Sequence, residues 1–285
     1  MKIKRSITGM EPYLQLLKHL SHAPTQLYIS GTLPEERRPS VAIVGTRKPT
    51  TYGREVSYDL AYTLARKGVV IISGLALGVD ALAHRGALDA GGVTIAVLAN
   101  GLDEIYPATH LSLAKEIIKK GGVLVSEYEP GVKARDFQFL ARNRIVSGLS
   151  DAVVVTEAAE RSGTLSTVNH ALDQNKEVFA VPGAITSLLS VGPNRLLKQG
   201  AHPALSADDI LEVIAPELLI TQTRLVLGSN PLENKLITLI VEGVRDGEHL
   251  QQQSGAETSD FLTALTMLEI NGHIRSLGAN QWTLI

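Results

Sequence analysis

The chain has 285 residues, of which 44% are hydrophobic and only 4% aromatic, and its formal net charge at pH 7 is −2. This length and composition predict one large domain with an aliphatic core plus a small domain. The charge excludes a globally basic nucleic-acid binder, although not a local basic patch. The chain has no cysteine, which excludes disulfides, a thiolate metal site and a cysteine nucleophile.

The start of the chain, MKIKRSITGM, is basic but lacks the apolar run of a signal peptide. No stretch approaches the length of a membrane span. We therefore expect a cytoplasmic protein without membrane insertion.

The sequence predicts four segments. They are a lead-in over residues 1–40 that packs on the main domain, a main domain over 41–215, a linker over 216–230 and a small domain over 231–285. In the lead-in, leucines between Leu14 and Leu20 predict a short helix, and Leu27–Ile29 a short strand. The linker prediction depends on weak periodicity and a Gly–Ser–Asn–Pro run.

Strand and helix patterns alternate through the main domain. Strands are expected at 41–45, 69–73, 94–99, 123–126, 152–156 and 178–181. Helices are expected at 53–67, around 80–85, and at 111–120, 141–149, 164–173, 196–199 and 207–214. Six strands that alternate with helices predict an α/β fold with a doubly wound, mostly parallel sheet.

The small domain reads as three short helices followed by a β-ribbon, which is a winged-helix pattern. Its seven acidic residues against Lys235, Arg245 and Arg275 leave a net charge of −4. A helix that reads DNA should be basic, yet the third predicted helix carries acidic side chains and no Lys or Arg. We therefore interpret this domain as a protein-contact module or a lid and not as a DNA reader.

The stretch VAIVGTRKPTTYG combines a buried strand, a polar loop and a helix start. Backbone N–H groups and the helix dipole at such a place favour an anion. The loop residues Gly45, Thr46, Arg47 and Lys48 add a guanidinium, an ammonium and a hydroxyl that can donate to phosphate. The alternative is a plain strand-to-helix turn with solvated charges. A dinucleotide fingerprint and a Walker A motif are both absent.

Similar Gly/Ser/Thr loops follow three of the predicted strands. They are Gly45–Thr46–Arg47, Ser73–Gly74 and Ser162–Gly163–Thr164. Because the carboxyl ends of parallel strands lie on one edge of a sheet, the three loops should converge on one crevice. Together they favour a phosphate or nucleotide ligand over turn chemistry alone.

A second basic feature is the segment KARDFQFLARNR, in which four cations surround two phenylalanines. Cations interleaved with aromatic rings suit a single nucleic-acid strand, so Phe137 and Phe139 are candidates for base stacking. In the alternative, which we favour for the two rings, they belong to the core. For Arg142 and Arg144, which flank Asn143, we favour binding, because a helix N-terminus there would add to the positive field.

Four other polar residues have competing interpretations. Asp80 and His84 could be a general base or a metal pair, but without a third ligand a structural Asp–His hydrogen bond is the better interpretation. Glu127 and Glu157 each follow a strand and could be an acid/base pair. We prefer that they orient Arg142 or Arg144.

Several long motifs resemble one family. In chain order they are VAIVGTRKPTTYG, SGLALGVDALAHRGAL, GLDEIYP, RNRIVSGLS, VVVTEAAERSGTLSTVNHAL and VFAVPGAITS…GPNRLLKQGA. The match runs from about Tyr13 to the C-terminus, and long motifs in the right order are far more specific than a lone glycine pattern. The chain therefore resembles the DprA/Smf family (DNA processing protein A).

This resemblance implies an extended Rossmann-like domain that binds single-stranded DNA, forms homodimers and loads the RecA recombinase. It ties the protein to natural transformation, where incoming single strands must be protected and handed on. Neither a chemical reaction nor a cofactor is expected. The resemblance places phosphate contacts at Gly45, Thr46, Arg47, Arg142, Asn143, Arg144, Ser162, Gly163 and Thr164, and the C-terminal domain resembles the winged helix that some members carry.

Two other functions compete with this hypothesis. A Rossmann-like nucleotide hydrolase of the nucleoside monophosphate phosphoribohydrolase type would use Glu127 or Glu157 as its key acid. A transcription regulator would act through the winged helix, although the acidic third helix counts against it.

Overall fold

The computed structural model describes residues 2–7, 11–219, 230–278 and 280–284. The chain divides after Leu219 into two compact units, which are described separately. Most of the predicted linker over 216–230 lies outside the described residues, and the predicted domain limits stay predictions.

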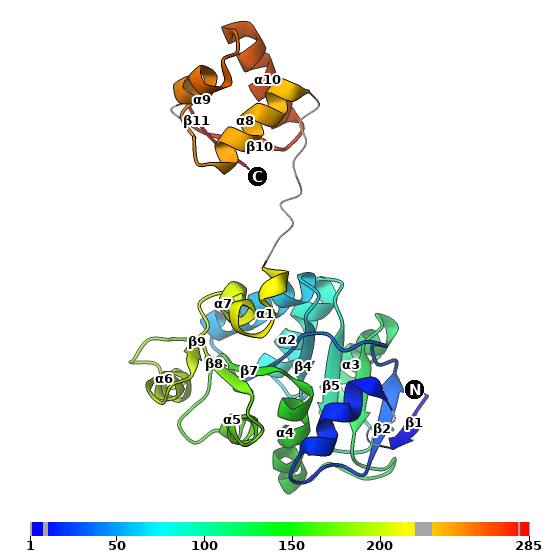
Figure 1. Cartoon of the computed structure of the whole chain (residues 1–285). Coiled ribbons are helices and arrows are strands. Elements are labelled where there is room, and N and C mark those ends of the chain that lie inside the picture. Colours follow the sequence, from blue (N-terminus) through cyan, green and yellow to red (C-terminus); the bar gives the residue numbers. More distant parts are fainter. Residues whose placement is uncertain (1, 8–10, 220–229, 279, 285) are drawn as a thin grey trace. The chain divides into compact units, whose positions relative to one another are not determined.

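A nine-stranded sheet forms the centre of the first unit (Figure 1). Its strands are β1 Lys4–Ile7, β2 Gln26–Gly31, β3 Ser40–Val44, β4 Val70–Ser73, β5 Thr94–Leu98, β6 Val123–Ser126, β7 Ala152–Val155, β8 Glu177–Ala180 and β9 His202–Pro203. Their order across the sheet is β1-β2-β6-β5-β4-β3-β7-β8-β9. Strands β3 to β9 run parallel, whereas β1 and β2 are antiparallel additions at the β6 edge.

Helices cover both faces of this sheet. They are η1 Pro12–His19, α1 Thr51–Arg66, α2 Val79–Asp89, η2 Ala108–His110, α3 Leu111–Lys119, α4 Asp136–Leu149, α5 Thr164–Asp173, α6 Val191–Lys198, α7 Ala207–Ile214 and η3 Pro216–Leu218. Residues of η1, α4, α5 and α6 belong to the apolar cluster on one face, and residues of α1, α2, α3 and α7 to the clusters on the other. The predicted doubly wound, mostly parallel α/β fold is confirmed.

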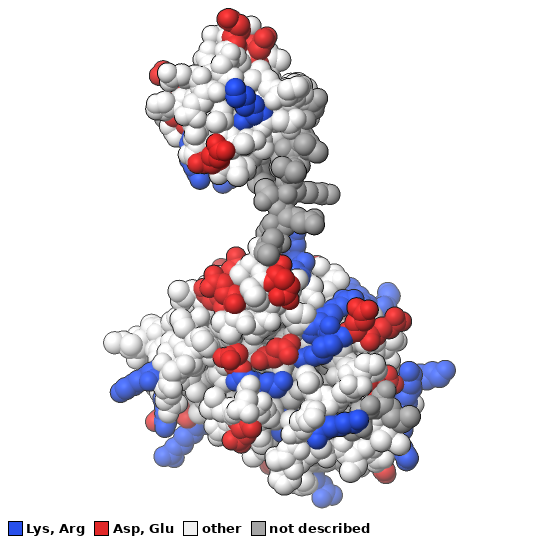
Figure 2. Space-filling view, viewed as in Figure 1, with Lys and Arg blue, Asp and Glu red and all other residues white. Residues whose placement is uncertain are grey.

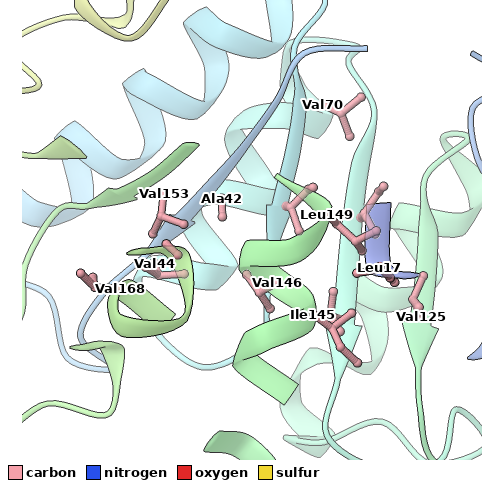
Figure 3. Close-up of a cluster of buried hydrophobic side chains, with 14 of the residues drawn as sticks. Leu17, Ala42, Val44, Val70, Val125, Ile145, Val146, Leu149, Val153 and Val168 are labelled. Atoms are coloured by element: carbon pink, nitrogen blue, oxygen red, sulfur yellow. The ribbon is translucent and has the colours of Figure 1, made fainter. Parts of the chain in front are cut away.

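The central strands of the sheet are buried on both faces. Successive side chains of a strand point to opposite faces, and helices cover each of them. In β3, Ala42 and Val44 join the first cluster, which Figure 3 shows against Ile145 and Val146 of α4. The intervening residues of β3 pack under α1 and α2. A strand buried on both faces has to be apolar throughout, which explains the run VAIV.

The strand order reverses beside β3. Strands β4, β5 and β6 follow on one side of β3, whereas β7 and β8 lie on its other side. The loops that leave β3 and β7 are therefore neighbours at the carboxyl edge of the sheet. This switch point is the usual ligand site of an open α/β sheet.

All seven predicted helices of the main domain are present, but only two have the predicted bounds, and α4 and α6 each begin five residues earlier than predicted. Helices α5 and α7 span 164–173 and 207–214, as predicted. Helix α4 begins at Asp136 and not at residue 141, after Arg135 in extended conformation. The prediction of a helix N-terminus at Arg142 and Arg144 is therefore wrong, because both lie well inside the helix. Phe137 and Phe139 lie on opposite sides of α4. Their spacing of two residues is not the spacing of three or four that marks the apolar face of a helix, so it did not indicate this helix.

The second unit contains the predicted three helices and terminal ribbon. They are α8 Pro231–Val241, α9 Gly247–Ser254, α10 Thr258–Ile270 and the antiparallel pair β10 Ile274–Gly278 and β11 Gln281–Leu284. Leu236, Leu250, Phe261 and Leu268 centre its separate apolar cluster. Its assignment as a winged helix stays a prediction. Among the described residues of the whole chain, no helix is both long and apolar enough to cross a membrane.

A buried histidine lies between α2 and the sheet. The Nδ1 atom of His84 lies 2.7 Å from the hydroxyl of Thr94, and that hydroxyl donates to the carbonyl of Ile71 at 2.7 Å. Since the hydroxyl proton is already used, it accepts from Nδ1–H, and Nε2 is buried without a partner in the described structure. The predicted Asp80–His84 hydrogen bond is wrong, because Asp80 accepts from the backbone N–H groups of Gly74 and Ala76.

Acid should destabilise the protein through His84. Burial is the largest cause that lowers the pKa of His84 from 6.5 to about 3, with smaller contributions from His110 and Arg142. Since the folded-state pKa is depressed, this stability is complete above about pH 6.5 and is lost as the pH falls toward 3. Between about pH 7 and about pH 5 the free energy of unfolding should fall by about 2 kcal/mol through this group.

Urea unfolding at both pH values tests this prediction. The variant His84→Asn, which keeps a donor toward Thr94, should lose about 2 kcal/mol less than the wild type between the two pH values. His22→Asn, at an exposed position, is the matched control and should behave as the wild type. Equal acid losses in His84→Asn and the wild type would contradict the prediction.

Candidate nucleic-acid interface

A cavity of about 740 Å³ lies at the switch point of the sheet, and we call it the switch-point cavity. It is lined from the loops after β3, β4 and β7 and from α4. The polar lining side chains and the glycines are Gly45, Thr46, Arg47, Lys48, Gly74, Asp80, Asp136, Arg142, Asn143, Arg161, Ser162, Gly163, Thr164 and Thr167. The predicted convergence of three loops on one crevice is confirmed.

The loop after β3 is held by backbone contacts that leave its cations free. The N–H of Thr46 donates to the carbonyl of Glu157 at 2.7 Å, and Val79 N–H donates to the carbonyl of Thr46 at 3.2 Å. Gly78 has φ +79°, and a Cβ there would lie 2.4 Å from the Thr46 carbonyl oxygen. Only glycine therefore permits the β4–α2 loop to approach so closely. Arg47, which follows Thr46, is exposed to solvent.

The loop after β7 faces the loop after β3 across the switch point. The hydroxyl of Ser162 accepts from the N–H of Thr164 at 3.2 Å and donates to its hydroxyl at 3.0 Å. The Thr164 hydroxyl in turn donates to the carbonyl of Gly45 at 3.1 Å. These contacts hold the N-terminus of α5, which begins after Gly163, beside the loop after β3. A helix N-terminus in this position favours an anion.

Arg142 lines the cavity but points into the protein. It is 5% exposed, and its Nη1 atom donates to the carbonyls of Gly74, at 2.7 Å, and Val97. A Cβ on Gly74 would lie 2.5 Å from this guanidinium, which explains the glycine. Burial raises the pKa of the Asp80 carboxyl, while Arg142 and two backbone N–H groups act in the opposite direction. Arg142 is thus engaged within the fold, and its predicted contact with phosphate stays a prediction that this geometry disfavours.

Arg144 and Ser73 do not line the switch-point cavity. Arg144 forms two hydrogen bonds with Glu127, at 2.7 and 2.8 Å, and lines a separate cavity of about 410 Å³ between η1, α4 and α5. The hydroxyl of Ser73 is fully buried and donates to the carbonyl of Ile43 at 2.8 Å. Their predicted placement at the crevice is wrong, because each side chain has a partner inside the fold. The preferred interpretation of Glu127 as an orienting residue is confirmed.

Glu157 is engaged in the same way. It is 1% exposed and accepts from the N–H and the hydroxyl of Thr50, at 2.8 and 2.6 Å. It therefore holds Thr50, the N-cap residue of α1, and does not orient Arg142 or Arg144. Neither Glu157 nor Glu127 lines the switch-point cavity.

The expectation that both phenylalanines belong to the core is wrong. Phe137 is 63% exposed, and Phe139 is partly buried at the cavity. The guanidinium carbon of Arg47 lies 5.4 Å from the centre of the Phe139 ring, a cation–π contact. Helix α4 starts early enough to carry both rings on its first turn, and neither ring belongs to the apolar clusters on the sheet.

One cation that lines the cavity, Arg161, was not predicted from the sequence. Arg161 precedes the Ser162 loop and is exposed. Its position directly before a predicted phosphate loop is the signal that could have identified it. Among the described residues, Arg47, Lys48 and Arg161 form no ion pair with a carboxylate, so their charges are available to a ligand.

The charge of the first unit is otherwise mixed. On the face seen in Figure 2, basic and acidic side chains alternate and do not form a single basic field. No group of three or more His, Asp or Glu side chains that could hold a metal occurs in the described parts of the chain. The three free cations of the cavity are therefore a local feature.

Comparison with known proteins identifies relatives of this chain. A family model described as DNA recombination-mediator protein A matches residues 5–215. DNA processing protein DprA of Bacillus subtilis (strain 168) is 43% identical over 209 residues, which cover 73% of this chain and 69% of the relative. Protein Smf of Escherichia coli (strain K12) is 46% identical over 263 residues, which cover 89% of this chain and 70% of the relative.

Two solved structures of DprA proteins have the same fold. The protein from Streptococcus pneumoniae has a TM-score of 0.69 at 37% identity, and the match covers 75% of each chain. The protein from Helicobacter pylori, whose structure was reported for its single-stranded DNA binding mode, has a TM-score of 0.67 at 32% identity. That match covers 76% of this chain and 97% of the other. With the matching family model and these relatives, the chain belongs to the DNA recombination-mediator protein A family, the DprA/Smf proteins.

Proposed function

We propose that this protein binds single-stranded DNA at the switch-point cavity and protects incoming strands during natural transformation. Arg47, Lys48 and Arg161 contact phosphates, and the N-terminus of α5 adds its partial positive charge. The family to which the chain belongs and the single-strand binding reported for the H. pylori relative support this proposal.

The observation that carries the proposal is the gathering of three exposed cations, none with a carboxylate partner in the described structure, at one cavity. Cations without an acidic partner gain more from phosphate than paired cations do, because no existing ion pair must be broken. The Phe139 ring at the cavity supplies a flat surface, which unpaired bases need and a duplex cannot use. These features favour a single strand.

The proposal extends to partners. As in the family resemblance, the protein forms a homodimer and hands the bound strand to the RecA recombinase in the cytoplasm. Two copies would present two cavities to one strand and raise its effective affinity without new contacts. Light scattering would test the dimer, and RecA filament assembly on protein-coated DNA would test the loading step.

The nucleotide hydrolase hypothesis has no comparable support. Its candidate acids, Glu127 and Glu157, are engaged with Arg144 and Thr50 and do not line the cavity. A general acid or base must reach the reacting group. Release of ribose phosphate from nucleoside monophosphates would revive that hypothesis.

Replacing Arg47 should weaken DNA binding in a salt-dependent way. With three phosphates neutralised, the log–log plot of affinity against salt should have a slope of about −2 for the wild type. Arg47→Ala should reduce the magnitude of the slope by about 0.7, and Arg47→Glu should abolish binding at low salt. Fluorescence anisotropy of a labelled oligo-dT, beside a duplex of equal length, measures both effects.

The matched control is Arg54→Ala, which removes an exposed arginine of α1 that does not line the cavity. It should bind as the wild type does. If Arg54→Ala and Arg47→Ala had equal effects, the binding site would lie elsewhere. A wild-type protein that binds no single strand at low salt would overturn the proposed function.

Replacing Arg142 should affect folding and not the DNA contact itself. Arg142→Met would leave the carbonyls of Gly74 and Val97 buried without their donor, and it would remove the positive charge beside Asp80. It should lower the free energy of unfolding by about 3–5 kcal/mol. Chemical denaturation measures this loss. The control is Arg135→Met, which replaces the exposed arginine directly before α4. It should lower the free energy of unfolding by less than about 0.5 kcal/mol. A fully stable Arg142→Met that has lost DNA binding would contradict this assignment.

A further inference from the structure

A tyrosine outside the switch-point cavity extends the aromatic surface at its edge. The ring centre of Tyr106 lies 5.5 Å from that of Phe139, with 52° between the ring planes. Phe139 also has the Arg47 guanidinium over its ring at 5.4 Å. The three side chains come from the β5–η2 loop, α4 and the β3–α1 loop, which lie far apart in the sequence. They form a continuous cation–aromatic–aromatic group that we call the Arg47–Phe139–Tyr106 stack.

Tyr106 is the most accessible ring of this stack. It is 47% exposed, whereas Phe139 is partly buried and already has contacts with two neighbours. A planar group that arrives from solvent therefore finds more free surface on Tyr106 than on Phe139. Phe137 does not compete for this role, because it neither lines the cavity nor contacts Phe139 within the described structure.

The loop that carries Tyr106 is anchored by the residues directly before the ring. Ile105 and Leu102 are buried in the apolar cluster under α3. The side-chain amide of Asn100 donates to the carbonyl of Glu104 at 2.6 Å, and the Asn100 carbonyl accepts from the hydroxyl of Ser126 at 2.7 Å. A ring on such a loop is positioned before the ligand arrives, so that binding loses little conformational entropy.

We propose that Tyr106 is the stacking platform for an unpaired nucleobase, while Arg47, at the other end of the stack, contacts a phosphate. This inference rests on the proposed function and adds a base subsite outside the cavity to it. Phe139 connects the two ends of the stack: it holds the guanidinium at the cavity and supports the tyrosine ring. Every base has a flat face, so this subsite favours single strands with little preference for sequence.

Two oligonucleotides with equal numbers of phosphates test the proposal. One is oligo-dT and the other carries tetrahydrofuran abasic sites in place of all internal bases. Tyr106→Ala should weaken oligo-dT binding about tenfold and leave the abasic strand unaffected, since base stacking is lost and the phosphates are unchanged. Tyr106→Phe should bind both strands as the wild type does. A 2-aminopurine base in the strand should be quenched by the wild type and by Tyr106→Phe but not by Tyr106→Ala.

The matched control is Phe137→Ala, which removes an exposed ring from the other side of α4. It should change neither affinity. Equal weakening of both strands by Tyr106→Ala, or equal effects of Phe137→Ala and Tyr106→Ala on oligo-dT, would overturn the subsite and leave the proposed function intact. If the wild type binds neither strand, the proposed function itself fails. Thermal melting of each variant shows that the fold is kept, as expected for an exposed side chain.

Discussion

The buried guanidinium of Arg142 is the contact on which the geometry of the interface depends. It ties the middle of α4 to the carbonyls of Gly74 and Val97, where β4 and β5 end, beside the Asp80 carboxylate. A buried arginine is tolerated only when such acceptors surround it. Because α4 is held here, Phe139, which lies about one turn earlier on the helix, is held beside the loop after β3.

The arginines and the lysine in and around the switch-point cavity fall into two classes with different physical roles. Arg142 and Arg144 have acceptors inside the fold, and they position α4. Arg47, Lys48 and Arg161 are exposed without an ion pair in the described structure. Only these three exposed side chains can bind phosphate at a small cost in free energy, because no bond to a group of the described structure has to be broken first. Charge density along the chain does not separate these classes.

The two units differ in charge and in whether the matches to related proteins include them. The matching family model ends at residue 215, and the match to the B. subtilis protein covers 209 residues, whereas the match to E. coli Smf covers 89% of the chain and so extends into the second unit. The net charge of −4 over residues 231–285 opposes contact with phosphate. The proposed DNA site draws all of its residues from the first unit, which agrees with this division.

The sequence by itself determined the α/β class, most strands, the bounds of α5 and α7 and the three polar loops at the switch point. Each of these depends on signals within a few residues, such as an apolar run that ends in Gly, Ser or Thr. Only the tertiary structure decided which side chains face the ligand. Arg142 and Arg144 flank the same asparagine, yet their different directions on α4 give them different partners, the strand-end carbonyls and Glu127. Tyr106 joins the interface through a contact with Phe139 on a distant helix. Exposure and partners are set by packing between distant segments, and no local pattern records that packing.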